Sequence, residues 1–124
     1  MINFSQPWDS AHNRDVWQQR PSVSSGADCP SPLTRCMAIV GDDTIWPRTG
    51  RRQRTEITSG TSYTLAAIVA NDTSVNWMQP IDFDVDAALA DYEPHMSLLA
   101  VFVDGHVDVV NNVSREKLRD LIRI

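Results

Sequence analysis

Hydrophobic residues are concentrated in a few short runs along the chain, separated by polar residues and turn formers. Cys36–Val40 is an apolar run that ends at Gly41 and Asp42, a pattern typical of a buried strand. Residues 62–70 are rich in β-branched, aromatic and threonine side chains and predict a second strand. A shorter apolar piece follows at residues 75–78. The pattern therefore predicts a sheet built from the middle of the chain.

The strongest local pattern lies at residues 98–110, where two apolar runs flank the pair Asp104-Gly105. An Asp-Gly pair in this position favours a hairpin with a two-residue type I′ turn. In that register Val103 lies opposite His106. The apolar face that packs on the core then consists of Leu98, Ala100, Phe102, Val107 and Val109.

Short helices are predicted near both ends of the chain. Asp9 or Ser10 is expected to cap a helix that runs to about Gln19. Ser114 is the expected N-cap of a second helix over residues 114–124. The apolar residues of this second helix recur on one side, so we expect it to pack on the sheet.

These elements divide the chain into a loop-rich N-terminal segment (residues 1–35), a sheet core (residues 36–113) and a C-terminal helix (residues 114–124). One or two further helical turns are predicted at residues 86–92. The length of 124 residues fits one domain. The sequence therefore predicts a single α+β domain over residues 1–124, with an antiparallel sheet, a C-terminal hairpin and short flanking helices.

Composition limits the classes of function. The 16 acidic residues outnumber the 11 Lys and Arg residues, and the net charge of −5 argues against a nucleic-acid partner. Apolar residues make up 42% of the chain, which argues against disorder. The apolar runs are much shorter than the roughly 20 residues of a membrane span, and no leader peptide is visible. We therefore expect no membrane span in this chain.

Charge is unevenly distributed along the sequence. Residues 71–113 contain no Lys or Arg and carry Asp72, Asp82, Asp84, Asp86, Asp91, Glu93, Asp104 and Asp108. Upstream, an arginine-rich segment contains Arg48, Arg51, Arg52 and Arg54. Two interpretations stay open: the opposite charges meet within the fold or at a subunit contact, or they form separate solvated surfaces.

Part of the acidic stretch has the spacing of calcium ligands. The carboxylates at relative positions one, three, five and twelve of an EF-hand loop correspond to Asp82, Asp84, Asp86 and Glu93. Ala87 stands where that loop requires glycine, and Pro80 stands where its first helix belongs, so an EF-hand is not expected. A looser calcium or small-ligand site at residues 82–93 and ordinary solvent-facing carboxylates are both open. No other cofactor is indicated.

Cys29 and Cys36 are separated by six residues. This spacing differs from the Cys-x2-Cys pairs of zinc sites, and no second pair is present. A disulfide between them is expected if the protein is exported, and two unpaired thiols are the alternative.

No motif in the sequence indicates catalysis. The chain has no Gly-x-Ser-x-Gly elbow and no phosphate-binding glycine loop. Its histidines are His12, His95 and His106, which are too scattered to indicate a catalytic or zinc site. We therefore expect the protein not to be an enzyme.

Several short motifs follow one another in the order found in one known family. They are Pro7-Trp8-Asp9-Ser10, Cys29-Pro30-Ser31, Trp46-Pro47, Gly60-Thr61-Ser62, Trp77 with Pro80, and Phe102 with Asp104-Gly105. On these motifs, which span nearly the whole chain, the sequence resembles the C-terminal globular part of bacterial prepilin-like proteins. The relevant family carries the prepilin-processing-associated His-x9-Asp-Gly domain, a domain of unknown function. Its N-terminal pilin helix has no counterpart in this sequence.

The resemblance implies a pilin-like head that acts without catalysis through contacts with protein partners or through self-association. It also implies a location in the cell envelope or outside the cell, although the lack of a visible leader leaves the cytoplasm open. The residues that correspond to the family motif are His95, Asp104 and Gly105. A calcium- or small-ligand-binding module on residues 82–93 is the alternative function.

Overall fold

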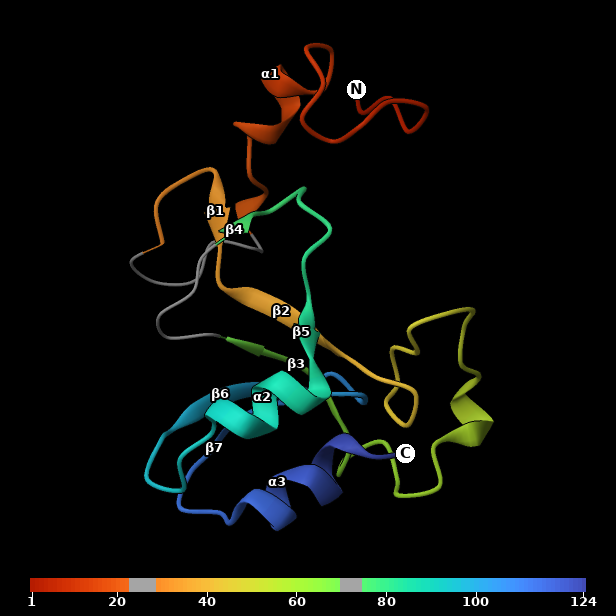
Figure 1. Cartoon of the computed structure of the whole chain (residues 1–124), viewed down its shortest axis with the longest axis vertical. Helices are drawn as coiled ribbons and strands as arrows, with labels where there is room; N and C mark the ends of the chain where they lie inside the picture. Colours follow the sequence, from red (N-terminus) through yellow and green to blue (C-terminus); the bar gives the residue numbers. More distant parts are fainter. Residues whose placement is uncertain (23–28, 70–74) are drawn as a thin grey trace. The chain divides into compact units, whose positions relative to one another are not determined.

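The computed structural model describes residues 1–22, 29–69 and 75–124 (Figure 1). The fold is α+β, with short helices and sheets that are largely antiparallel, as predicted. The chain divides into two compact units. The first unit is Met1–Cys36 with Ala70–Ile81, and the second is Met37–Val69 with Asp82–Ile124.

The first unit contains a short helix and a small sheet. The helix α1 is Arg14–Trp17, and the sheet pairs β1 (Leu33–Thr34) antiparallel with β4 (Val75–Asn76). Aromatic side chains join these parts. Trp8 meets Trp17 edge to face at 5.7 Å, and Trp77 Nε1 donates to the carbonyl oxygen of Trp17 at 2.9 Å.

The helix α1 has its N-cap at Asn13, three or four residues after the predicted cap at Asp9 or Ser10. Ser10 nevertheless bonds as a cap does, because its Oγ accepts from the N–H of Asn13 at 3.2 Å and its carbonyl oxygen accepts from the N–H of Arg14 at 3.0 Å. The side chain of Asn13 is only 1% exposed. Its Oδ1 accepts from the backbone N–H of Asn3 at 2.8 Å, and its Nδ2 donates to the carbonyl oxygens of Asn3 and Pro7. These bonds tie the start of α1 to the N-terminal residues before it.

The second unit is built around a five-stranded sheet with the order β5-β2-β3-β6-β7. The strands are β2 (Cys36–Val40), β3 (Leu65–Val69), β5 (Phe83–Asp84), β6 (Leu98–Phe102) and β7 (Val107–Val110). β6 pairs antiparallel with both β3 and β7, whereas β5 runs parallel to β2. The predicted antiparallel pairing is confirmed for β3, β6 and β7, and the parallel pair of β5 with β2 makes the sheet mixed.

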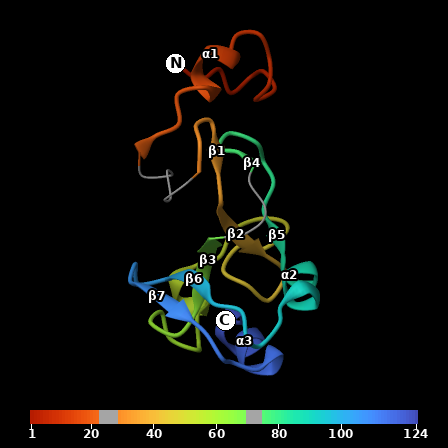
Figure 2. The ribbon, with the colours of Figure 1, turned by 90° about the vertical axis from the view of Figure 1, so that its left-hand side faces the viewer.

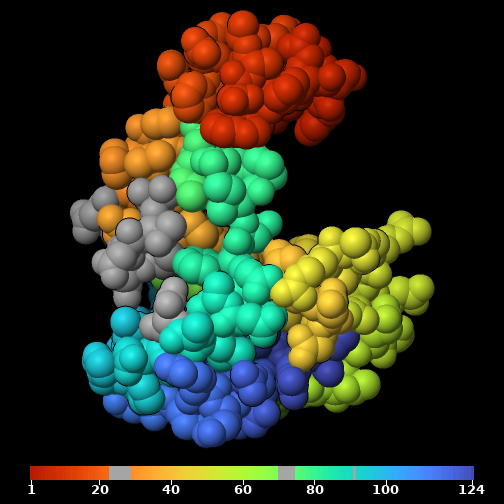
Figure 3. Space-filling model, viewed as in Figure 1, coloured from red at the N-terminus to blue at the C-terminus, as the bar shows by residue number. Residues whose placement is uncertain are grey.

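Two helices cover one face of this sheet, α2 (Val85–Asp91) and α3 (Arg115–Ile122). Figure 2 shows both helices on the same side of β6 and β7, and Figure 3 shows them side by side. The predicted cap of the last helix is confirmed, because Ser114 Oγ accepts from the N–H of Lys117 at 3.1 Å. Leu118 and Ile122 of α3 are buried, so this helix packs by its apolar side as predicted.

The core of the second unit lies between the sheet and these helices. Its buried members are Ile39, Leu65, Ile68, Val85, Leu89, Tyr92, Ala100, Phe102, Val110, Leu118 and Ile122. Close packing at the end of β2 depends on Gly41, where a Cβ atom would stand 2.5 Å from Cγ1 of Val85. Only glycine therefore allows the backbone to approach α2 this closely at that point.

The predicted hairpin is present, but its register differs from the prediction by one residue. Leu99 lies opposite Val109 and Val101 lies opposite Val107. Gly105 has φ +94°, whereas Asp104 has no positive φ, which excludes the type I′ turn.

The turn is instead a three-residue loop closed by backbone bonds. The N–H of Phe102 donates to the carbonyl oxygen of His106, and the N–H of Gly105 donates to the carbonyl oxygen of Phe102. A shift of one residue turns every side chain of a strand to the other face, and here the shift affects β7. Val107 and Val109 therefore lie outside the core, and Val110 lies in it. The predicted core positions on β6 are confirmed.

Candidate interaction surface and arginine cavity

The face of the hairpin that points away from the helices is apolar. We call Leu99, Val107 and Val109 the outer face; these side chains are 43%, 57% and 48% exposed. Cross-strand pairing brings Leu99 beside Val109, and Val101, which is half-buried, beside Val107. β3 continues the surface with half-buried Ala67 and Val69. Three large exposed apolar side chains thus stand together on two neighbouring strands.

Among the strands that the structure describes, β7 is the last of this sheet, so the outer face ends at a strand edge. The N–H of Phe102 donates to the carbonyl oxygen of His106, so these two residues form a hydrogen-bonded pair. Hydrogen-bonded and non-hydrogen-bonded pairs alternate along antiparallel strands, so the N–H groups of Val107 and Val109 point away from β6. One of these two donors is covered locally, since Asp108 Oδ1 accepts from the N–H of Val109 at 2.7 Å. The Asp108 carboxylate therefore makes this edge less available for pairing with another strand.

The charge around the outer face is acidic. β3, β6 and β7 contain no Lys or Arg, and Asp104 and Asp108 are exposed at the hairpin. A second copy of the same face would bring like charges together, whereas a basic surface would complement it.

The family-motif residues lie at opposite ends of β6. His95 is exposed in the segment before β6, while Asp104 and Gly105 form the turn after it. The partner of Asp104 is His106, whose backbone N–H and ring Nδ1 lie 3.1 and 2.6 Å from Asp104 Oδ1. The backbone bond from His106, with side-chain bonds from Ser62 and His106, lowers the pKa of Asp104 to about 2. In the described chain these contacts give Asp104 a role in holding the turn.

A cavity of about 590 Å³ opens beside the end of β2. Its lining residues are Ala38, Val40, Ile45, Trp46, Pro47, Arg48, Gly50, Arg51, Arg52 and Asp82. The alternation of β2 explains part of this lining, because Met37 and Ile39 are buried while Ala38 and Val40 are only half-buried. The rest comes from the loop that follows β2 and from Asp82, so we call it the arginine cavity.

The loop is held in place by a buried threonine. Thr44 Oγ1 donates to the carbonyl oxygen of Gly41 or Trp46, each at 3.0 Å, and accepts from the N–H of Trp46 at 3.1 Å. Trp46 Nε1 donates to the carbonyl oxygen of Ala66 on β3 at 2.7 Å. Trp46 is thus held by hydrogen bonds at both its backbone and its indole ring, while 48% of the residue stays exposed.

Arg48 joins the arginine-rich segment to the acidic stretch. Its guanidinium lies within 4 Å of the carboxylates of Asp42, Asp84 and Asp86. The hydrogen bond to Asp84 raises the pKa of Arg48 and lowers that of Asp84, whose pKa the N–H of Asp86 lowers further. The interpretation that the opposite charges meet within the fold is therefore confirmed for this arginine.

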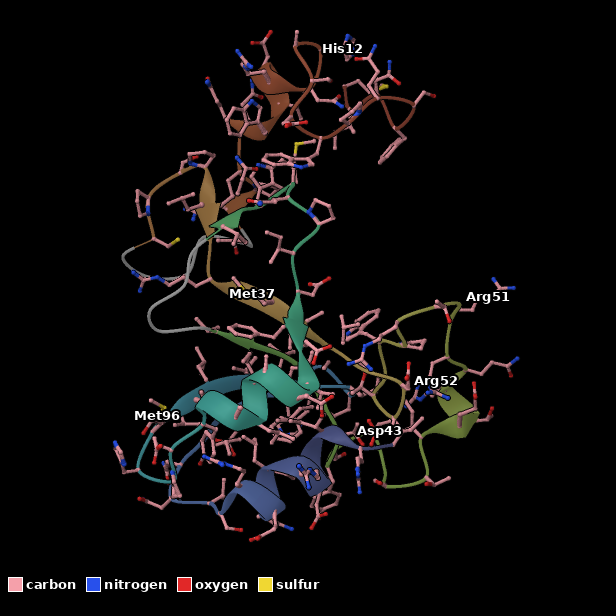
Figure 4. All side chains as sticks on the ribbon, viewed as in Figure 1. His12, Met37, Asp43, Arg51, Arg52 and Met96 are labelled. Atoms are coloured by element: carbon pink, nitrogen blue, oxygen red, sulfur yellow. The ribbon has the colours of Figure 1, made fainter. Side chains whose placement is uncertain are left out.

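Arg52 and Arg51 differ although they are neighbours (Figure 4). Arg52 donates to the carbonyl oxygens of Thr44 and Asp42 and pairs with Glu56 at 3.4 Å, so it holds the loop together. The Arg51 side chain makes no hydrogen bond or ion pair with any residue that the structure describes. Figure 4 shows it at the outer end of the loop.

The predicted calcium ligands are used in other ways. Asp82 Oδ1 accepts from the N–H of Ala38 at 3.3 Å, and Asp84 Oδ1 caps α2 by accepting from the N–H of Asp86 at 3.0 Å. Glu93 is exposed beyond the end of α2. Within residues 1–22, 29–69 and 75–124, no three acidic, histidine or cysteine side chains are grouped so as to hold a metal ion.

Cys29 and Cys36 are both free thiols in this structure, and the disulfide expected for an exported protein stays a prediction. Cys29 is buried and Cys36 is exposed, and no disulfide joins them. Although Cys36 is exposed as a residue, partial burial of its thiol raises the pKa of that group, which disfavours the reactive thiolate.

Sequence reasoning did not identify the arginine cavity or the outer face. The pair Trp46-Pro47 next to the arginine-rich segment was the available signal for the cavity. No comparable signal marked the outer face, since its residues are apolar like the buried residues of the core face.

No match to this chain is found among models of protein families, among curated proteins or among solved structures. The resemblance to prepilin-like proteins therefore stays a prediction. In the part of the chain that the structure describes, no helix has the length and apolar character needed to cross a membrane.

Proposed function

We propose that this protein is a non-enzymatic, pseudopilin-like domain of the cell envelope that works by binding another protein through the outer face of its hairpin. The observation that carries the proposal is the exposure of Leu99, Val107 and Val109 on one side of two paired strands. Exposed apolar side chains that gather in one patch mark contact surfaces, whereas single ones have no such meaning.

The chemistry of the surface suggests the kind of partner. The outer face has no cation on its own strands and has carboxylates at its turn and edge. A partner surface with apolar residues and a basic rim would bury the valines and pair with the carboxylates.

The test places a photoreactive benzophenone amino acid at position 109 of the whole chain in its native cells. Irradiation is expected to give one crosslinked product of defined mass in the envelope fraction, whose partner is then identified by mass spectrometry. The matched control places the same residue at Glu116, which is exposed on α3 on the other side of the sheet.

The substitution V107K in the photoreactive protein is expected to remove the crosslink by putting an ammonium group into the apolar contact. The same products from positions 109 and 116, or no change with V107K, would contradict the proposal.

The alternative function, a calcium or small-ligand module at residues 82–93, gains no support from these contacts. The Arg48 guanidinium already binds Asp84 and Asp86, and the other oxygen of Asp84 caps α2. A calcium ion would have to displace both interactions. A rise in melting temperature with millimolar calcium would nevertheless favour this alternative, because a ligand of the native state stabilises it.

A further inference from the structure

We propose that the arginine cavity binds a small organic carboxylate with a flat apolar body, with Arg51 pairing with the carboxylate and Trp46 contacting the body. This site is separate from the outer face and does not depend on the proposed function. It shares Asp82 with the predicted calcium ligands, but its other lining residues are basic or apolar.

The state of the three arginines in the lining identifies the one that is available to a ligand. Arg48 is neutralised by surrounding carboxylates, and Arg52 is held by backbone carbonyl oxygens and Glu56. Arg51 is exposed and has no partner among the described residues. A free guanidinium presents a planar set of N–H donors that matches a carboxylate with two parallel hydrogen bonds.

The indole of Trp46 supplies the second half of the recognition. Its Nε1–H already donates to Ala66, so the ring has no polar group left to satisfy and offers apolar surface. Val40, Ile45 and Pro47 extend this surface within the same cavity. A ligand with a flat apolar body gains by removing this surface and its own from water.

Asp82 sets the direction of the ligand. Its carboxylate lies in the lining and is fixed by the N–H of Ala38, so it repels an anionic group at that end. The ligand carboxylate therefore lies toward Arg51. The volume of about 590 Å³ suits one small molecule, since such sites measure roughly 300–1,000 Å³.

The experiment titrates the whole ¹⁵N-labelled protein with three probes and follows the indole Nε1–H signal of Trp46 by NMR. Phenylacetate carries both the ring and the carboxylate, phenylacetamide carries the ring without the charge, and acetate carries the charge without the ring. Phenylacetate is expected to shift the Trp46 signal saturably, with an affinity about tenfold higher than that of either other probe.

The substitution R51Q is expected to weaken phenylacetate binding about tenfold, because it removes the charge and the paired donors. The matched control is R54Q, which removes an arginine of the same segment that is exposed and does not line the cavity. Both residues are exposed, so both variants are expected to keep the wild-type spectrum elsewhere. Equal binding by R51Q and R54Q, equal binding of the amide and the acid, or no shift at tens of millimolar would overturn the proposal.

Discussion

The two faces of the β6–β7 hairpin both carry large apolar side chains but have different environments. The face toward the helices contains Ala100, Phe102 and Val110, each at most 7% exposed. The outer face contains Leu99, Val107 and Val109, each at least 43% exposed. Hydrophobicity alone therefore does not distinguish a core face from a contact surface. The difference lies in whether another element covers the face, and α2 and α3 cover only one.

The largest expected effect tests this difference with one truncation on each face. Phe102→Ala leaves a cavity in the core and is expected to lower the free energy of unfolding by about 3–5 kcal/mol. Val107→Ala removes apolar atoms that are already in contact with water and is expected to change it by less than about 0.5 kcal/mol. Urea unfolding followed by circular dichroism measures both values. Similar losses for the two variants would mean that the outer face is covered.

The hairpin illustrates how far the sequence could predict the fold. Apolar runs around Asp104-Gly105 correctly predicted two paired strands and the core face of β6. The face of β7 was not predictable, because it depends on a difference of one residue in loop length. Contacts within the turn decide that length: Gly105 alone takes a positive φ, and Asp104 binds the N–H of His106.

The acidic stretch illustrates the same limit for the candidate sites. A spacing of alternate carboxylates is the same for calcium ligands, helix caps and ion-pair partners. Asp84 caps α2 because a helix begins directly after it, which the sequence indicated, and it binds Arg48 from a segment 36 residues away, which the sequence left open. The arginine cavity depends on further distant contacts, such as the bond from Trp46 Nε1 to Ala66.

A smaller effect, confined to acid, is expected from the turn that joins the two strands. The pKa of Asp104 is lowered to about 2 in the folded protein, so near pH 3 the unfolded chain binds more protons at this residue. Its stabilisation is therefore fully present above about pH 4 and is lost as the pH falls toward 2.

The variant Asp104→Asn removes this titrating group from the turn. Unfolding curves at pH 2 to 6 are expected to show a shallower loss of stability in acid for Asp104→Asn than for the wild type. Asp120→Asn, at an exposed position on α3, is the control and is expected to keep the wild-type slope. Parallel curves for the wild type and Asp104→Asn would show that the turn contacts do not lower the pKa of Asp104.

The smallest expected effect on stability, below about 0.5 kcal/mol, belongs to Asp108 at the edge of β7. Asp108→Ala leaves the buried residues of the core face intact. It frees the N–H of Val109, which donates to the Asp108 carboxylate in the wild type. The outer face then adjoins an edge whose two outward N–H groups are both available to another strand. Sedimentation velocity at rising protein concentration is expected to show self-association of Asp108→Ala.

The control Asp120→Ala removes the same charge from an exposed position on α3 and is expected to keep the association state of the wild type. Association of both variants alike would point to net charge, and association of neither would mean that the outer face needs a partner of different chemistry.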